Sequence, residues 1–311
     1  MKKRMMKTMC GLLFGGAFLW FLPSIGLSQC NVSVGAVSYP SIQNAIDTTT
    51  SPVTISVTGT CYENLVINAL EVNTRLTVPL GKTATITGTN PSMPTIHILG
   101  KSITVENFTI NGPFNGIQVM FGGTAFINHN TISTGKYGIF IAVNSFASIG
   151  GNTITNNLLD GIIVTNNSYA NIGSEGWDWD PVSVPNIIQG NEYGVSVSRS
   201  SSAKIVGNTI SSNTYDGVRV LAVSLAVISN NTIDGNGRNG ILVVQNSGVN
   251  LGRDTGETIF DLPNSSIVGN GAFGVSCDTG GYADGRLGTL GGVDDKSATN
   301  FTKDCIDSLI P

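Results

Sequence analysis

The sequence has few charged residues and almost no histidine. Charged side chains make up 12% of the 311 residues, and the only histidines are His97 and His129. A surface that holds nucleic acid or an anionic membrane needs a concentration of Lys and Arg. The chain has 16 of these against 20 Asp and Glu, so we expect no nucleic-acid partner. With two histidines, and His129 predicted to lie in a solvated turn, we expect no catalytic histidine.

Long apolar runs are missing after the N-terminal segment. Four basic residues in the first seven precede an uninterrupted apolar stretch, Gly11–Leu22, and Pro23 follows it. This pattern predicts a secretory signal peptide over residues 1–28 and no transmembrane segment in the mature chain. Its removal takes away four of the 16 basic residues and none of the 20 acidic ones, which leaves a net charge of −8. We expect an exported protein that is periplasmic, bound to the cell surface or secreted.

Paired cysteine motifs of the CxxC type are absent, which argues against a cysteine-bound metal. Once Cys10 is removed with the signal, four cysteines remain, and an even number in an exported protein favours disulfides. Three connectivities are open. We favour Cys30–Cys61 and Cys277–Cys305 because each pair closes a short loop at one end of the chain. Lipidation at Cys30 stays an alternative, although Gln29 stands where a lipoprotein signal has a small residue.

Helical periodicity is missing from most of the chain, and short alternating runs take its place. Residues 130–173 contain two copies of one pattern, which begin 22 residues apart at Asn130 and Asn152. Apolar residues at every second position indicate strands, and a fixed period near 22 predicts a solenoid with one coil per repeat. A glycine opens the first strand of each predicted coil. These glycines are Gly116, Gly138, Gly161, Gly194, Gly217, Gly240 and Gly274.

Inward-facing positions follow from this register. The third strand of each coil is expected to place one isoleucine in the core. These residues are Ile132, Ile154, Ile188, Ile210, Ile233 and Ile267. Two rows of asparagine at the turns are expected to be structural, because stacked amides hydrogen-bond from coil to coil. We divide the chain into a signal peptide (1–28), an N-terminal cap with a short amphipathic helix (29–63) and a solenoid (64–311) whose C-terminal cap begins near residue 278.

The coil pattern, together with residues 41–47 and 59–64 at its opening, resembles the right-handed parallel β-helix proteins of the pectin-lyase-like superfold. The resemblance covers nearly all of the mature chain and implies an all-β, right-handed parallel β-helix. That superfold contains lyases, hydrolases, esterases, epimerases and adhesins, so it does not imply one activity. The Gly-His-Gly, Asn-Thr-Asp and Asp-Pro-His-Asp segments of its enzyme families are absent here. Whether the protein is an enzyme stays open, and an enzyme would be a polysaccharide lyase or glycoside hydrolase.

One candidate site lies in the residues directly before the coil-opening glycines. Asp160 and Asp216 would stand two coils apart, roughly 10 Å by strand spacing, slightly more than an inverting carboxylate pair uses. One could act as general acid and the other as the base for water, with Tyr193 between them and Arg219 beside them. Tyr137, Tyr193, Arg219 and Asn239 would contact substrate. The alternative is ordinary Asp-Gly and Asn-Gly turn chemistry.

A second candidate site lies in two insertions of about 12 residues, after Gly173 and Gly252. Trp177 and Trp179 could stack on sugar rings, although one of them could instead cover the coil as a lid. The acids in these insertions could supply oxygen ligands to Ca²⁺, and no cofactor is required. These acids are Asp178, Asp180, Asp254 and Glu257.

Together these features predict a monomeric exported protein that binds or processes extracellular or cell-envelope polysaccharide, with binding favoured over catalysis. The acidic surface favours a neutral glycan. The alternative is a structural or adhesive surface protein that contacts another protein and has no enzymatic activity.

Overall fold

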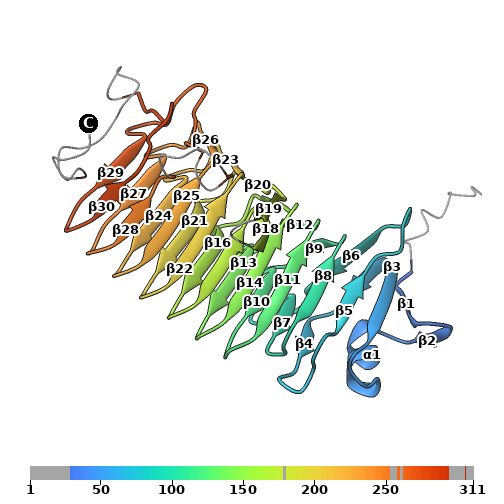
Figure 1. Ribbon diagram of the computed structural model, residues 1–311. Coiled ribbons are helices and arrows are strands. Elements are labelled where there is room, and N and C mark those ends of the chain that lie inside the picture. Colours follow the sequence, from blue (N-terminus) through green and yellow to red (C-terminus); the bar gives the residue numbers. More distant parts are fainter. Residues whose placement is uncertain (1–28, 178–179, 253–257, 260–261, 294–304, 306–311) are drawn as a thin grey trace, which may run out of the picture.

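The computed structural model describes residues 29–177, 180–252, 258–259, 262–293 and 305. They form a parallel β-solenoid in which three rows of strands run side by side along one axis (Figure 1). The predicted all-β fold is therefore confirmed. Within these residues the single α-helix is α1 (Ile42–Thr48). No helix in this part of the chain is both long and apolar enough to cross a membrane.

The three rows are named here sheets 1, 2 and 3, in the order in which each coil enters them. Sheet 1 contains β4 (Leu65–Ile67), β7 (Ile96–Ile98), β10 (Ile117–Val119), β13 (Ile139–Ala142), β16 (Asp160–Thr165), β21 (Tyr193–Ser198), β24 (Val218–Leu221), β27 (Ile241–Val243) and β29 (Val275–Cys277). Sheet 2 contains β1 (Asn31–Val34), β2 (Val37–Tyr39), β3 (Thr54–Tyr62), β5 (Arg75–Thr77), β8 (Ile103–Glu106), β11 (Thr124–Asn128), β14 (Phe146–Gly150), β17 (Tyr169–Ile172), β22 (Ser202–Val206), β25 (Leu225–Ser229), β28 (Gly248–Asn250) and β30 (Tyr282–Asp284).

Sheet 3 contains β6 (Ala84–Thr87), β9 (Thr109–Asn111), β12 (Thr131–Ser133), β15 (Thr153–Thr155), β20 (Ile187–Gln189), β23 (Thr209–Ser211) and β26 (Thr232–Asp234). Strand β3 pairs with β5 in sheet 2 and with β6 in sheet 3, so hydrogen bonds connect these two rows. The coils proper pair in parallel. Strands β1 and β2 add an antiparallel edge at the N-terminal end.

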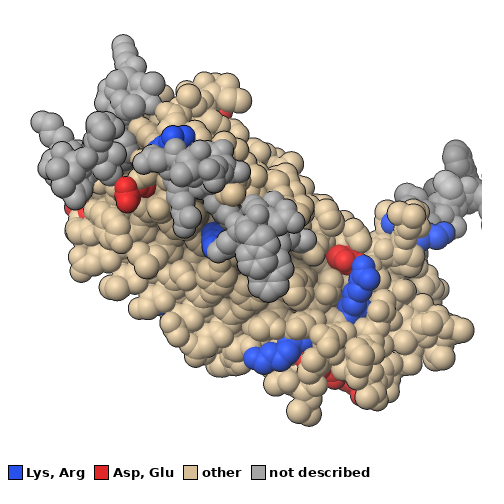
Figure 2. All heavy atoms as spheres, viewed as in Figure 1, with Lys and Arg blue, Asp and Glu red and all other residues tan. Residues whose placement is uncertain are grey.

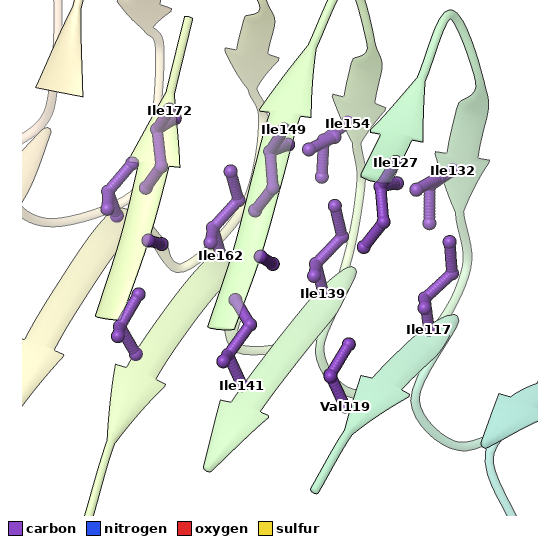
Figure 3. Packing of buried hydrophobic residues seen from close by; sticks show 14 of the residues in the cluster. Ile117, Val119, Ile127, Ile132, Ile139, Ile141, Ile149, Ile154, Ile162 and Ile172 are labelled. Atoms are coloured by element: carbon purple, nitrogen blue, oxygen red, sulfur yellow. The ribbon is translucent and has the colours of Figure 1, made fainter. Parts of the chain in front are cut away.

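Like residues stack on like residues in the core. Ile139 pairs with Ile117 on one side and with Ile162 on the other, and all three are fully buried. Figure 3 shows the isoleucines of the three sheets pointing into one narrow interior. A column of alanines in sheet 2 runs beside these isoleucines. In these strands of sheet 2 a small alanine alternates with a large isoleucine, which suits close packing of a narrow interior.

One inward position was predicted wrongly. Ile267 is 85% exposed instead of lying in the core. The backbone amide of Asn231 donates to Asn264 Oδ1, and Ser265 pairs with Thr232, so Ser266 takes the position that corresponds to Ile233. The coil therefore starts one residue earlier than the sequence pattern indicated. A shift of one residue turns a strand side chain to the opposite face.

The two ladders of buried asparagines confirm the predicted structural role of these residues. Asn152 Nδ2 donates to Asn186 Oδ1 at 3.0 Å, and Asn186 Nδ2 donates to Asn208 Oδ1 at 2.9 Å. The backbone amide of Asn152 also donates to Asn186 Oδ1, at 2.9 Å. Each amide of this ladder therefore satisfies buried backbone groups at the turn from sheet 2 to sheet 3, where no regular strand pairing is available. The second ladder, in which Asn157 Nδ2 donates to Asn191 Oδ1 at 2.9 Å, lies between sheets 3 and 1.

Disulfides lie near both ends of the described solenoid. Cys30 is joined to Cys61 with a Cα–Cα distance of 4.8 Å, which confirms that predicted pairing, and Cys277 is joined to Cys305 with a distance of 4.9 Å. At the N-terminal end, the Glu63 carboxylate accepts hydrogen bonds from the first amides of α1, those of Ile42 and Gln43, both at 3.0 Å. Unpaired amides at a helix start favour such a carboxylate.

The first insertion leaves the coil between sheets 2 and 3. Gly173, at a φ of +90°, turns the chain out of β17, and a side chain there would collide with the backbone of the next coil. The antiparallel strands β18 (Ser174–Trp177) and β19 (Asp180–Ser183) follow. β18 lies beside β14 and β22. The insertion therefore adds a hairpin at the carboxyl end of sheet 2.

Candidate functional site on sheet 1

The site predicted before the glycines is organised around Asp160, whose side chain is buried. Asp160 starts β16 in register with Tyr193 of β21, and the residue is 1% exposed. Its Oδ1 accepts hydrogen bonds from Ser196 Oγ and from an Arg219 amino group, the latter at 3.0 Å. The Arg219 Nε donates to Ser196 Oγ at 2.6 Å. The next two coils thus hold one carboxylate through two direct hydrogen bonds, and a third bond joins the two donors to each other.

Arg219 also joins this network to an aromatic surface. Its guanidinium lies 3.5 Å from the centroid of the Tyr193 ring, a cation–π contact. The Tyr193 ring lies 5.3 Å from that of Tyr215 in a tilted arrangement, and the Arg238 guanidinium lies 5.9 Å from the Tyr215 centroid. Tyr193 and Arg219 were predicted to lie together, and they do. Tyr215 and Arg238 extend the group toward the next coil.

A second aromatic group lies on the coils before Asp160. The rings of Tyr137 and Phe140 are tilted with centroids 5.4 Å apart. The Lys136 ammonium lies 5.5 Å from the Tyr137 centroid and 6.0 Å from that of Phe114. Aromatic rings with a cation over them therefore stand on either side of Asp160 along the axis of the solenoid.

Asp216, the other predicted catalytic carboxylate, is in a separate network. Asp216 is 0% exposed, and its Oδ1 accepts from the backbone amide and the side-chain amide of Asn239, at 3.1 and 2.8 Å. Within the described residues its Oδ2 is buried and has no hydrogen-bond partner. Asn239, predicted to contact substrate, donates both of these hydrogen bonds to Asp216, and the substrate contact stays a prediction. Tyr193 stands between the two aspartates in register, since Gly194 N donates to Asp216 O.

Burial controls the protonation of this region. Burial raises the pKa of the Asp160 carboxyl above its usual value, and the nearby Arg219 opposes that rise without cancelling it. The pKa values of Tyr137 and Tyr193 are raised, first by burial, so both stay neutral at physiological pH and present uncharged rings. The group can therefore offer flat apolar faces and a cation held in place.

The two histidines lie apart from this network. His97 is in register with Gln118 on sheet 1, and burial lowers its pKa. Its Nε2 is buried without a hydrogen-bond partner in the part of the chain that the structure describes. His129 is an exposed turn residue with a φ of 55°, as the sequence indicated.

The insertion residues are only partly within the described chain. Trp177 ends β18 and is in register with Asp180 of β19. Asp178, Trp179, Asp254 and Glu257 lie outside the described residues. The calcium site and the tryptophan site remain predictions.

Sequence reasoning missed Ser196, which links Asp160 to Arg219. It also missed the supporting aromatic and basic residues Lys136, Phe140, Tyr215 and Arg238. Ser196 and Phe140 occupy the outward positions of the first strand in each coil, so their place on sheet 1 could be predicted from the sequence. Their contacts with residues one or two coils away could not be predicted, because these contacts depend on side-chain direction.

Comparison with known proteins agrees with the architecture. The family model described as right handed beta helix region matches residues 82–176 and 184–282. Among solved structures, the A-module of a mannuronan C-5 epimerase from Azotobacter vinelandii is 13% identical over 73% of this chain and 84% of that one, with a TM-score of 0.33. No curated protein is significantly similar in sequence. Because the family model covers more than half of the residues, the chain belongs to the right-handed β-helix family.

Proposed function

We propose that this protein binds a polysaccharide on the outer face of sheet 1 and acts outside the cytoplasm. The observation that carries the proposal is the series of aromatic rings along the coils on either side of Asp160, each beside a cation: Tyr137 with Lys136, Tyr193 with Arg219 and Tyr215 with Arg238. Flat rings bind the apolar faces of sugars, while the cations and nearby polar groups accept or donate hydrogen bonds at the hydroxyls. The disulfides support an oxidising compartment.

The burial of the carboxylates supports binding over catalysis. A general acid must reach the proton that it transfers within hydrogen-bond distance. Asp160 is 1% exposed and held by Arg219, and Asp216 is 0% exposed and held by Asn239. Both carboxylates act as anchors for neighbouring side chains in this arrangement.

A neutral glycan fits this surface better than an anionic one. The chain carries a net charge of −4, and Figure 2 shows only scattered charged residues on the face that it presents. The Arg219 charge is largely compensated by Asp160. An anionic polymer would need a denser cationic surface to bind tightly.

An array of immobilised neutral and acidic oligosaccharides tests the proposal. The wild-type protein is expected to bind neutral glycans, and Tyr193→Ala and Tyr215→Ala to weaken binding about tenfold, the loss of roughly 1.4 kcal/mol of stacking energy. Tyr62→Ala is the matched control, because Tyr62 is an exposed tyrosine on β3 at the N-terminal end. No bound glycan, or equal losses in all three variants, would contradict glycan binding by sheet 1. The first of these outcomes would favour the adhesive alternative.

Two further arms of the same array address the remaining predictions. Trp177→Ala and Trp179→Ala test the insertion as a second contact, and calcium removal with a chelator tests the proposed Ca²⁺ site.

Any bound glycan is then incubated with the wild-type protein and its products are separated by mass. If a product appears, loss of that product in both Asp160→Asn and Asp216→Asn would support the acid–base pair. An unchanged rate in both would exclude the acid–base pair.

A further inference from the structure

A groove lies on a different face, the outside of sheet 2, and it is distinct from the candidate site described above. Its volume is about 370 Å³. It crosses the coils from β17 to β30, and two rows of outward residues line it: β17 contributes one residue, and the four following strands of sheet 2 contribute two each. The residues of its first row are Tyr169, Ser202, Leu225, Gly248 and Tyr282.

An aromatic ring stands at each end of this row, and Ser202, Leu225 and Gly248 lie between the rings. Tyr169 and Tyr282 are separated by four coil steps, which corresponds to about 19 Å at the spacing of paired strands. Ser202 and Gly248 stand next to the two rings, inside the row. The groove therefore has the length of a short oligosaccharide.

Both rings are oriented before any ligand arrives. The Tyr169 ring stacks on Phe146, with centroids 5.7 Å apart and an interplanar angle of 15°, and its hydroxyl donates to Asn171 Oδ1 at 2.6 Å. The Tyr282 ring lies over Gly248, since a Cβ built on that glycine would be 2.2 Å from a ring atom. Rings that are already fixed lose little conformational freedom when a flat ligand stacks on them.

The second row supplies polar groups of both signs. Lys204, Val227, Asn250 and Asp284 line the groove next to the first row. One ammonium and one carboxylate give the groove no net charge, which disfavours an acidic sugar chain. The amide of Asn250 and the carboxylate of Asp284 can hydrogen-bond hydroxyls, which suits a ligand with many hydroxyls and no charge.

We propose that this groove on sheet 2 is a second glycan-binding site, which takes a short neutral oligosaccharide between Tyr169 and Tyr282. It lies on another face from the sheet 1 site and uses none of its residues. The two sites can therefore succeed or fail independently.

Calorimetric titration of the mature protein with cellotetraose, mannotetraose and xylotetraose tests the groove, with tetragalacturonate as the acidic comparison. At least one neutral tetrasaccharide is expected to bind, and Tyr282→Ala to weaken it about tenfold, whereas Tyr282→Phe retains the ring and the affinity. Gly248→Ala is expected to weaken binding similarly, because the added methyl displaces the Tyr282 ring. Phe126→Ala is the matched control, an exposed aromatic residue of sheet 2 outside the groove.

Thermal melting of each variant separates lost binding from lost folding. Affinities are compared only for variants that melt at the same temperature as the wild type. The proposal is overturned if no neutral tetrasaccharide binds, if tetragalacturonate binds more tightly, or if Tyr282→Ala and Gly248→Ala bind as Phe126→Ala does. Tyr193→Ala distinguishes the two proposals. Binding that is lost in Tyr193→Ala and kept in Tyr282→Ala would belong to sheet 1 and would exclude the groove. The reverse result would support the groove alone.

Discussion

At the scale of single residues, the Asp160–Arg219 pair decides how sheet 1 is held together. The Asp160 side chain is 2% exposed and that of Arg219 is 23% exposed, with 3.0 Å between the paired atoms. Removing one partner of a buried pair leaves an uncompensated charge, which costs about 3–5 kcal/mol. Water reaches part of the guanidinium, so the lower end of this range applies. The pair therefore fixes Tyr193 and Ser196 against β16.

Arg219→Met is expected to lower the free energy of unfolding by about 3 kcal/mol, since the carboxylate of Asp160 would stay buried without a cation. Denaturant titration followed by circular dichroism measures this change. Arg238→Met is the control, because Arg238 is exposed and only approaches the Tyr215 ring at 5.9 Å, and it should change stability by less than about 0.5 kcal/mol. Equal stability of Arg219→Met and wild type would show that the pair has no net role in folding.

The protonation of Asp160 is expected to make the stability of the protein depend on pH, with a sign that follows from its raised pKa. Burial, partly opposed by Arg219, raises its folded-state pKa above 3.8. Between the unfolded and folded pKa values the folded protein holds the extra proton, so this residue makes the protein less stable as pH rises through that window. The stability of the wild type minus that of Asp160→Asn should therefore fall as pH increases from below 3.8 toward neutrality. A difference that is flat or that rises with pH would show that the folded-state pKa of Asp160 is not raised.

At the scale of elements, the asparagine ladder connects the coils at the turn between sheets 2 and 3. Asn186 Oδ1 accepts from the backbone amide of Asn152 at 2.9 Å, and Asn186 Nδ2 donates to Ile149 O at 2.9 Å. Both partners are buried. Substitution of one rung therefore leaves buried polar groups without partners on the adjacent coil.

Asn186→Ala is expected to destabilise the protein by about 2–4 kcal/mol, because each buried group left without a partner costs about 1–3 kcal/mol. Thr209→Ala, at an exposed position in the neighbouring strand β23, is the control and should cost less than about 1 kcal/mol. Urea unfolding measures both. Hydrogen exchange should also show faster exchange at Asn152 in Asn186→Ala than in wild type. Unchanged exchange there would mean that the ladder bond contributes no protection.

The sequence predicts the strands and their inward residues where the core packing repeats from coil to coil, and it does not predict them where this repeat is interrupted. Ile132, Ile154 and Ile188 are buried as predicted, because alternation of period two leaves only one face of each strand apolar enough to line the interior. The predicted register was wrong at Ile267. The two residues before it are serines, so no apolar residue in the sequence indicated which position faces inward. The contact of Arg219 with Tyr193 and Asp160 spans coils, and a linear pattern carries no information on which rotamer a long side chain adopts.

At the scale of the whole molecule, each coil contacts mainly its neighbours, so stability is a sum of local terms and the ends are the weakest parts. The N-terminal end is strengthened by the Cys30–Cys61 disulfide, which joins the segment before β1 to strand β3 across 31 residues. A loop of this length corresponds to about 3–4 kcal/mol in the chain-entropy description. In a solenoid this energy acts on the first coils and not on the middle ones.

The double variant Cys30→Ala/Cys61→Ala is therefore expected to open from its N-terminal end while the middle coils stay folded. Hydrogen exchange followed by mass spectrometry should show protection lost in β1 to β5 and retained in β13 to β24, where Ile139, Ile162 and Val195 stack without a disulfide. Tyr62→Ala, which leaves the disulfide intact, is the control. Uniform loss of protection along the chain would show instead that the coils unfold as one cooperative unit, and that the disulfide stabilises all of them together.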